Sequence, residues 1–293
     1  MKHLDSKTKL FVEKSTLEER IKATRKFKWI GYTAASKTMN KLEELISYPK
    51  SHRMPNLLLV GDSNNGKTAI LSRFDQKYLA HIDEETGRLS CPCLFIQAPP
   101  EPDEKRFYNS ILEKLFAPHK TSEKIDSRQR RVISLLKELE VKILVIDEIH
   151  HVLAGSPSKQ RLFLNVLKYL SNELKIPLVC SGTRLAFNAI QSDQQLANRF
   201  EPKVLHRWVN DKEFKRLLLS FERLLPLKKE SLLIENTISS KILSLSDGLI
   251  GEVSKILELS TILAIQNGKE KIDISILNSI DYVSPLKRKK IHY

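Results

Sequence analysis

Short runs of apolar residues alternate with amphipathic segments through the middle of the chain. Such runs are typical of strands buried on both faces of a parallel sheet. They are NLLLV, CLFIQA, KILVID, IPLVCSGT and a fifth candidate, KVLHRWV. The segments between them repeat apolar residues at spacings of three and four, so that Ile70, Phe74 and Tyr78 share one helix face. The pattern predicts an α/β fold, a doubly wound parallel sheet with helices on both sides.

The character of the chain changes after Asn210. The later segments DKEFKRLLLSFERLLPL, TISSKILSLSD, IGEVSKILELSTILAIQN and DISILNSIDYV all have a helical pattern. Four parts are therefore expected: a basic, flexible or weakly helical arm (1–27), an α/β core (28–209), a small helical lid (210–282) and a basic, disordered tail (283–293). Within the core, WIGYTAASKTMNKLEELISYP and KTAILSRFDQKYLAHI are each expected to be one helix.

The composition adds a strong positive charge to this picture. The 293 residues carry a formal net charge of +14, which indicates a polyanionic partner such as nucleic acid; a solvated basic surface is the alternative. The N-terminus is charged throughout and no apolar run reaches membrane-spanning length, so no membrane partner is expected. Three cysteines suit a reducing compartment, and together these features predict a cytoplasmic protein.

A phosphate-binding loop follows the first apolar run. The chain there fits the pattern G-x-x-x-x-G-K-[ST], in which backbone N–H groups, a lysine and the next helix N-terminus hold phosphates while a hydroxyl binds Mg²⁺. The placement of this loop between a strand and a helix supports the interpretation, and the alternative is a plain glycine-rich turn. The nucleotide-binding residues predicted from this loop are Gly61, Asp62, Ser63, Asn64, Asn65, Gly66, Lys67, Thr68 and Ala69.

A pair of acids ends the third apolar run, KILVIDEIHH. Asp147 lies at the carboxyl end of this strand, where an acid can hold Mg²⁺ together with Thr68. Glu148 is then placed to polarise a water for attack on the γ-phosphate, unless both acids merely end the strand in solvent. His150 and His151 are interpreted as solvated or supporting residues, because adjacent residues are expected to point to opposite sides.

Several classes of phosphate-loop protein share these features. A GTPase needs an N-K-x-D motif that is missing after the third strand, and a helicase with a DExH box needs a second sheet domain. A small-molecule kinase would need neither Glu148 nor the positive charge. An AAA+ ATPase fits, since it combines one α/β core with a helical lid and shares its active sites between subunits.

Polar residues after the fourth and before the fifth apolar run fit the AAA+ interpretation. Ser181 or Thr183 could orient the attacking water or sense the γ-phosphate, although turn residues would look the same. Arg199 is predicted to reach the nucleotide of a neighbouring subunit, with Arg184 as a second candidate and a surface salt bridge as the alternative. In the lid, GEVSK carries Ser254 where a sensor arginine is expected, which leaves Lys255 as the candidate.

A narrower resemblance rests on segments spread over residues 28–260. They are WIGYTAA, PNLLLVGDSNNGKT, APPEPDEKRFYNSILEKLFAP, ILVIDEIHHVLAGS, FLNVLKYLSNELKIPLVCSGT and QLANRF. Together they resemble the TniB and TnsC regulators of Tn5053-like and Tn7-like transposons, and more distantly MuB and IstB. The resemblance implies a bacterial protein, nucleoid-associated when on DNA, that binds ATP and Mg²⁺ and assembles on double-stranded DNA as a homo-oligomeric ring or filament. It also implies recruitment of a transposase and of a TniQ-like target selector, with hydrolysis limiting the assembly.

The positive charge agrees with such a use, since a filament on DNA needs many phosphate contacts. The DNA contacts are expected at Lys105, Arg106, Lys120, Thr121, Lys124, Arg128, Arg130 and Arg131. Lys105 and Arg106 could equally be a solvated helix face, and the arm and tail are alternative anchors. Trp29, Ile30 and Tyr32 are expected to line the adenine pocket, or else to be core residues.

Two other functions remain open from the sequence. One is an AAA+ helicase loader or DNA remodeller of the IstB or DnaC kind, which a neighbouring replication gene would favour over a transposase gene. The other is a DNA-dependent motor, which would have to thread a single strand and displace its complement.

Overall fold

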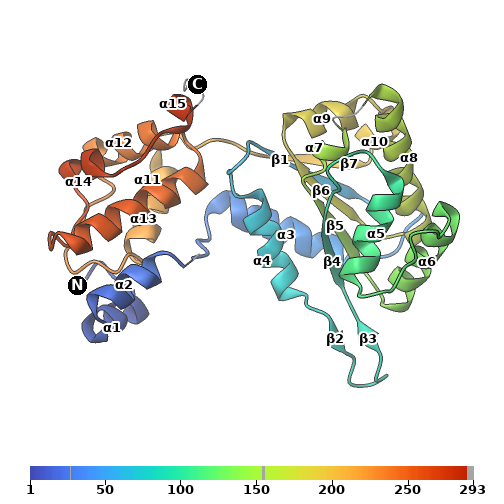
Figure 1. The fold of residues 1–293 in the computed structure, drawn as a ribbon, viewed down its shortest axis with the longest axis horizontal. Coiled ribbons are helices and arrows are strands. Elements are labelled where there is room, and N and C mark those ends of the chain that lie inside the picture. Colours follow the sequence, from blue (N-terminus) through green and yellow to red (C-terminus); the bar gives the residue numbers. More distant parts are fainter. Residues whose placement is uncertain (27, 154–155, 289–293) are drawn as a thin grey trace. The chain divides into compact units, whose positions relative to one another are not determined.

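The chain folds into two compact units, described here from a computed structural model that covers residues 1–26, 28–153 and 156–288 (Figure 1). The first is an α/β unit over residues 35–205, and the second is a helical unit that combines residues 1–34 with residues 206–293. These limits differ from the expected ones, since the N-terminal segment belongs with the C-terminal helices. Phe27, at the expected end of the arm, lies outside the described residues.

The sheet of the α/β unit has five parallel strands, as the apolar runs predict. Their order is β4 (Cys93–Gln97), β5 (Ile143–Asp147), β6 (Leu178–Gly182), β1 (Asn56–Gly61) and β7 (Phe200–Leu205). The strand β7 begins and ends earlier than KVLHRWV, because Phe200 pairs with Asn56 and Leu205 with Gly61, the first and last residues of β1. All five carboxyl ends therefore meet at one edge of the sheet.

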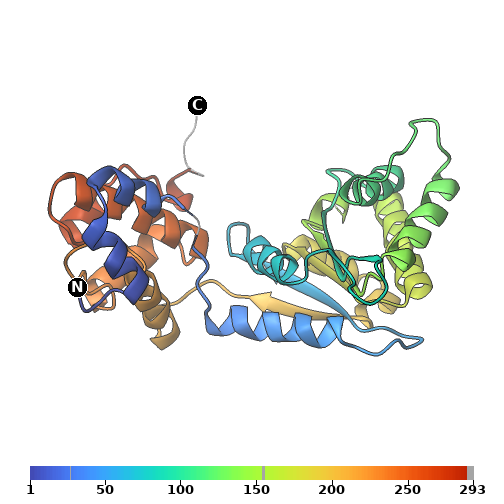
Figure 2. The ribbon, with the colours of Figure 1, turned by 90° about the horizontal axis from the view of Figure 1, so that it is seen from below.

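Helices cover both faces of this sheet (Figure 2). The core includes Leu58, Leu144 and Ile146 from the strands, and Phe107 packs edge-on against Phe163 with ring centroids 5.2 Å apart. The helices of the unit are α3 (Thr33–Ile46, which begins in the helical unit), α4 (Lys67–Lys77), α5 (Glu104–Lys114), α6 (Ile125–Glu138), α7 (His150–Leu153), α8 (Pro157–Leu174), α9 (Arg184–Gln191) and α10 (Gln194–Ala197).

A short hairpin replaces the end of the second predicted helix. The helix α4 stops at Lys77, and the strands β2 (His81–Ile82) and β3 (Leu89–Ser90) pair antiparallel before β4 begins. The expectation of one helix as far as residue 82 was wrong, because the residues that continue the helix face beyond Tyr78 find no surface to pack on. Leu79 and Ile82 are 63% and 68% exposed. The hairpin projects beyond the sheet (Figure 1).

The helical unit contains two helices from the segment expected to be a flexible or weakly helical arm. The helix α1 spans Ser6–Lys14 and α2 spans Leu17–Thr24, where Thr16 and Glu19 form a capping box. Arg20 of α2 is buried and pairs with Glu270 at 2.5 Å. The sequence pattern of the arm does not predict this packing, because the arm is held by an ion pair between residues 250 positions apart.

The remaining helices of this unit are α11 (Lys212–Glu222), α12 (Asn236–Ser246), α13 (Ile250–Gln266), α14 (Ile274–Ser279) and α15 (Pro285–Arg288). Phe214, Leu218 and Ile256 lie in its core. Part of the expected disordered tail is thus helical, and Arg288 binds Glu252 at 2.8 Å. Residues 289–293 lie outside the described residues. Among the described helices, none combines the length and the apolar character that crossing a membrane requires.

Candidate functional site

The loop between β1 and α4 has the backbone geometry of an anion cradle. Gly66 adopts φ +85° directly before α4, a left-handed conformation that glycine takes without strain. A Cβ on Gly61 would lie 3.2 Å from the backbone oxygen of Leu205, so the loop and β7 approach too closely for a side chain there. Asn65 is buried and donates from Nδ2 to the same oxygen at 2.8 Å. These contacts hold the loop in place and leave the first N–H groups of α4 to face an anion.

Lys67 lies inside this loop with only 3% of its surface exposed. Its Nζ donates to the backbone oxygens of Gly61 and Asp62, each at 2.9 Å. Burial lowers the pKa of Lys67, whereas the nearby carboxylates of Glu148, Asp147 and Asp62 act in the opposite direction. A desolvated ammonium gains more from an incoming phosphate than an exposed one would, because the interaction strengthens as the surroundings lose water.

Asp147 joins three elements at the carboxyl edge of the sheet. Thr68 Oγ1 donates to Asp147 Oδ2 at 2.6 Å, and the Ser181 hydroxyl and the backbone N–H of Glu148 both donate to Oδ1. The carboxylate is 3% exposed and accepts all three bonds. A hydroxyl and a carboxylate oxygen this close together are the hard oxygen donors that Mg²⁺ prefers, so the pair predicted from sequence fits that ion.

Glu148 follows in a left-handed backbone conformation, with φ +56°. Its Oε2 lies 3.2 Å from His150 Nε2 and 3.8 Å from His151 Nε2, and the two imidazole rings stack with centroids 4.4 Å apart. The expectation that the two histidines point to opposite sides was wrong. They begin the helix α7, where consecutive residues differ by about 100° rather than the 180° of a strand.

Of the two histidines, His150 lies closer to the predicted catalytic carboxylate. Burial lowers the pKa of His150, while Glu148 raises it and His151 lowers it further. The net lowering favours the neutral imidazole, and a neutral imidazole can orient Glu148 without neutralising its charge. The sequence signal that could have pointed to this role is the position of His150 two residues after Glu148.

Ser181 and Thr183 differ in what their hydroxyls contact. Ser181 binds Asp147, whereas Thr183 Oγ1 is buried and has no hydrogen-bond partner within the described residues. A buried hydroxyl without a partner is costly, and a ligand at the carboxyl edge of the sheet would relieve that cost. Arg184, the first residue of α9, is exposed beside it.

Arg199 lies at the other edge of the sheet. It precedes Phe200, which pairs with Asn56 at the start of β1, whereas the phosphate loop follows the end of β1. Its Nη1 donates to Asn172 Oδ1 at 2.5 Å. The structure therefore does not bring Arg199 to the phosphate loop of its own chain.

The remaining nucleotide candidates belong to the helical unit. Ile30 is in its core, and Tyr32 packs edge-on against Trp208 with ring centroids 5.2 Å apart. Burial raises the pKa of Tyr32 to about 12. These contacts agree with the core alternative for Ile30 and Tyr32. Trp29 is half-buried in the same segment, and Lys255 pairs with Glu258 at 3.0 Å on α13.

The predicted DNA contacts fall on α5, α6 and the loop between them. Lys105 Nζ donates to the backbone oxygen of Thr121 at 2.8 Å and ties this loop to α5. Arg128 is fully buried and donates to Asn109 and to the backbone oxygen of Lys120. The structure corrects the prediction for Arg128, since its guanidinium holds the loop from inside and cannot reach a phosphate.

The other basic residues of this region remain at the surface. Lys120, Lys124 and Arg130 are exposed. Arg131 is half-buried and pairs with Glu123 at 3.4 Å, and exposed Arg106 lies 3.6 Å from Asp103. Exposed cations on a surface loop can contact successive phosphates of a DNA strand. Lys120, Lys124 and Arg130 are therefore the strongest of the predicted DNA-contact residues.

Comparison with known proteins agrees with this geometry. A family model described as "Bacterial TniB protein" matches residues 20–210, which include the phosphate loop, Asp147, Glu148 and Arg199. Among curated proteins, none matches the sequence.

Solved structures with a similar fold include the ORC1 protein of Aeropyrum pernix in complex with DNA, with a TM-score of 0.59 and 17% identity over 84% of this chain and 63% of that one. CDC6P of Pyrobaculum aerophilum has a TM-score of 0.59 and 16% identity over 86% and 67% of the two chains. Drosophila ORC bound to DNA has a TM-score of 0.56 and 13% identity over 90% and 65%. The present chain thus spans 63% of the length of the ORC1 protein. The likeness shows the fold, that of an AAA+ P-loop protein, as predicted.

Proposed function

Because the chain belongs to the TniB family of bacterial proteins, we propose that it is an ATPase that regulates DNA transposition by assembling on duplex DNA. The observation that carries the proposal is the group formed by Lys67, Thr68, Asp147 and Glu148 at the carboxyl edge of an AAA+ sheet. This group has the residues that ATP binding and hydrolysis require, and the family match extends over it.

Each residue of this group has a distinct role in the proposed hydrolysis of ATP. The phosphate loop holds the β- and γ-phosphates through its N–H groups and through Lys67, which exchanges its bonds to Gly61 and Asp62 for phosphate oxygens. Thr68 and Asp147 would hold Mg²⁺, which supplies charge stabilisation to the transferring phosphoryl group. Glu148 accepts a proton from the attacking water, and His150 holds that carboxylate in position.

In the proposed oligomer, a neighbouring chain supplies an arginine to the nucleotide site. Arg199 lies at the opposite edge of the sheet from its own phosphate loop, so it can serve only the loop of a neighbouring chain. An arginine supplied in this way stabilises the charge that develops on the γ-phosphate. Nucleotide binding and the contact between chains then depend on each other, and hydrolysis weakens the oligomer on DNA.

The surface charge supports DNA as the platform for this oligomer. Lys120, Lys124 and Arg130 would contact phosphates, which makes binding strong at low salt and weakly selective for sequence. The net charge of +14 is of the sign that such a partner needs. The transposase and a TniQ-like target selector are the proposed protein partners of the DNA-bound form.

Electron microscopy of the protein with duplex DNA tests the proposal. A non-hydrolysable ATP analogue should give rings or filaments on DNA, and ADP or no nucleotide should give neither. Lys67→Ala is the control, because it removes the phosphate contact and leaves the DNA-binding surface intact. The proposal fails if oligomers on DNA form equally without nucleotide, or if none form with the analogue.

A transposition assay in cells tests the biological role. With the transposase and the target selector supplied together, insertions should depend on this protein and be lost with Lys67→Ala. Insertions that continue at the same frequency without the protein would contradict a role in transposition, even if it assembles on DNA.

A further inference from the structure

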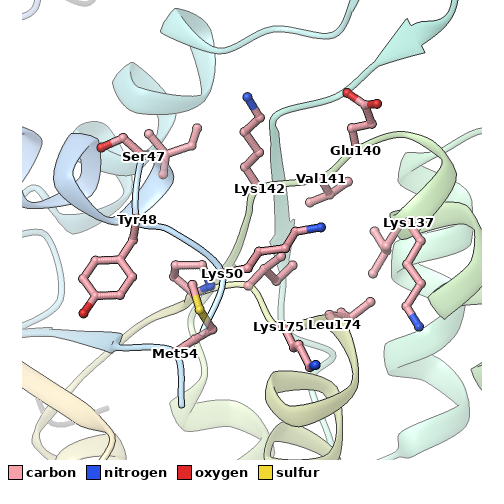
Figure 3. Close-up of a pocket in the computed structure, with 14 residues that line it drawn as sticks. Ser47, Tyr48, Lys50, Met54, Lys137, Glu140, Val141, Lys142, Leu174 and Lys175 are labelled. Atoms are coloured by element: carbon pink, nitrogen blue, oxygen red, sulfur yellow. The ribbon is translucent and has the colours of Figure 1, made fainter. Parts of the chain in front are cut away.

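A hollow opens at the amino edge of the sheet, on the side away from the phosphate loop. It encloses about 460 Å³, which lies within the ~300–1,000 Å³ of binding clefts. The segments that lead into β1, β5 and β6 form it, together with the ends of α3, α6 and α8 (Figure 3). Met54, Val141, Leu174 and Ile176 give it a buried apolar lining.

Four exposed lysines surround this apolar lining (Figure 3), namely Lys50, Lys137, Lys142 and Lys175. Glu140 is the single acid that lines the hollow. Lys137 is paired with Glu173 at 2.8 Å, whereas the side chains of Lys50 and Lys142 form no hydrogen bond or ion pair within the described residues. An apolar floor with an excess of positive charge at its rim fits an acidic segment that carries an apolar side chain.

The chain itself presents such a segment in the β2–β3 hairpin. Its turn carries three consecutive acids, of which Asp83 is partly buried and Glu84 and Glu85 are exposed. Ile82 and Leu89 form a cross-strand pair and are 68% and 52% exposed. Two strands of two residues each bury very little, and an isolated pair of strands is marginal in water. The hairpin therefore presents acidic and apolar groups that nothing in its own unit covers.

The hairpin does not reach the lysine-lined hollow of its own chain. The residues that line the hollow include none between Leu79 and Ser90. Tyr78 and Pro92, at the base of the hairpin, line a neighbouring hollow that shares Ile46, Ser47 and Lys142 with the first. Both features thus belong to the amino edge of one compact unit, side by side but separate.

We propose that the β2–β3 hairpin of one copy docks into the lysine-lined hollow of a second copy. The acids of the turn meet the lysines, and Ile82 and Leu89 cover the apolar lining. Since hairpin and hollow lie at the same edge, a two-fold arrangement lets each copy place its hairpin in the other, so that both contacts form in one closed dimer.

This contact does not use the residues that bind the nucleotide. The phosphate loop lies at the carboxyl edge, and no residue of the hairpin or the hollow belongs to the nucleotide site. The dimer should therefore form without nucleotide or DNA, whether or not the ATP-dependent oligomer exists.

Sedimentation equilibrium of the nucleotide-free, full-length protein up to about 100 µM tests the proposal. We expect a monomer–dimer equilibrium whose dissociation constant rises at least about tenfold between ~0.05 M and ~0.5 M salt, because the contact depends on charge. Two variants reverse the charges, D83K/E84K/E85K in the hairpin and K50E/K142E/K175E in the hollow. Each alone should be a monomer, since both of its contacts become repulsive.

An equimolar mixture of the two variants provides the decisive measurement. In a mixed pair each hairpin again faces a hollow of opposite charge, so the mixture should recover the dimer that neither variant forms alone. K9E/K212E/K229E carries the same charge change as the hollow variant on exposed lysines of the helical unit, and it should dimerise like the wild type. Circular dichroism checks that every variant is folded.

Three results would overturn the proposal. They are a wild-type protein that stays monomeric at every concentration, a dimer that survives both reversals, and a mixture that stays monomeric although both variants are folded. None of these results bears on whether ATP drives assembly on DNA, which the microscopy experiment tests independently.

Discussion

Thr68 Oγ1 and Asp147 Oδ2 lie 2.6 Å apart. This contact links α4, the helix after β1 and the phosphate loop, to the end of β5, which lies two places from β1 in the sheet. The strand β6 lies between β1 and β5, and its Ser181 hydroxyl donates a hydrogen bond to the same carboxylate. Three chain segments thus converge on Asp147, and a change at this residue affects all of them. The proposed Mg²⁺ site is therefore built before any ligand arrives.

Asp147→Asn should weaken the dependence of hydrolysis on Mg²⁺. The amide keeps the shape of the side chain but loses the charge, and a charged hydrogen-bonding contact is worth about 1.5–3 kcal/mol. We expect the Mg²⁺ concentration for half-maximal ATPase activity to rise about tenfold or more. Titrating Mg²⁺ at saturating ATP measures this, and an unchanged midpoint would remove Asp147 from the metal site.

Glu148→Gln should separate nucleotide binding from hydrolysis. A general base contributes about 10²- to 10⁴-fold to the rate, so kcat should fall by that factor while ATP affinity changes little. Oligomers on DNA should also persist longer, because hydrolysis no longer clears them. Phosphate release and the lifetime of the complexes under microscopy are the two readouts; loss of assembly would contradict the role of Glu148 as the base.

Arg199→Ala should lower ATPase turnover by about 10³-fold in the assembled form and leave the nucleotide affinity of the monomer nearly unchanged. The physical reason is that Arg199 lies at the edge of the sheet opposite its own phosphate loop. Nucleotide titration at low protein concentration and turnover on DNA separate the two effects. Arg184→Ala is the matched control, and a larger loss of turnover in that variant would transfer the role to Arg184.

Removing three exposed cations should weaken DNA binding in a salt-dependent way. The triple variant K120A/K124A/R130A loses three proposed phosphate contacts, so the negative slope of log K against log salt should become smaller in magnitude by about 2.7. Binding to different duplex sequences should weaken equally. Salt titrations of fluorescent duplexes measure the slope; an unchanged slope would place the DNA contact elsewhere, for example on the N-terminal helices.

Acid should destabilise the helical unit through the contact between Arg20 and Glu270. Burial alone would raise the pKa of Glu270, but hydrogen bonds from Arg20 and from the backbone N–H of Lys228 outweigh it and lower the pKa below the ordinary 4.5. A carboxylate with a lowered pKa stabilises the fold above its unfolded pKa, and the contribution disappears as the pH falls through the folded pKa.

Glu270→Gln should remove that contribution at every pH, because it leaves the buried Arg20 without a counter-charge. The free energy of unfolding at pH 7 should fall by about 3 kcal/mol. Urea unfolding at neutral pH and below about pH 4 should show the difference from the wild type narrowing in acid. Glu230→Gln, at an exposed site, is the control, and an equal loss in that variant would contradict the assignment.

The sequence by itself determined the sheet and the chemistry of its carboxyl edge. Apolar runs separated by amphipathic helices are typical of a parallel sheet covered on both faces, and a phosphate loop is a local motif whose backbone geometry depends on a few adjacent residues. The position of Asp147 near the phosphate loop was predicted in the same way, because parallel strands bring their carboxyl ends together. These features depend on short-range patterns, which one chain displays directly.

Only the tertiary structure decided which residues meet over long distances. The segment expected to be an arm joins the helical unit because Arg20 finds Glu270 across 250 positions, and Arg128 turns inward because the loop around it supplies acceptors. The two histidines stack because α7 begins at His150. The basic hollow gathers lysines from three separate segments, so no sequence spacing predicts it. The sequence shows how many charged side chains the protein carries. The fold decides which of them pair inside the protein, as Arg20 and Arg128 do, and which remain exposed to bind another molecule.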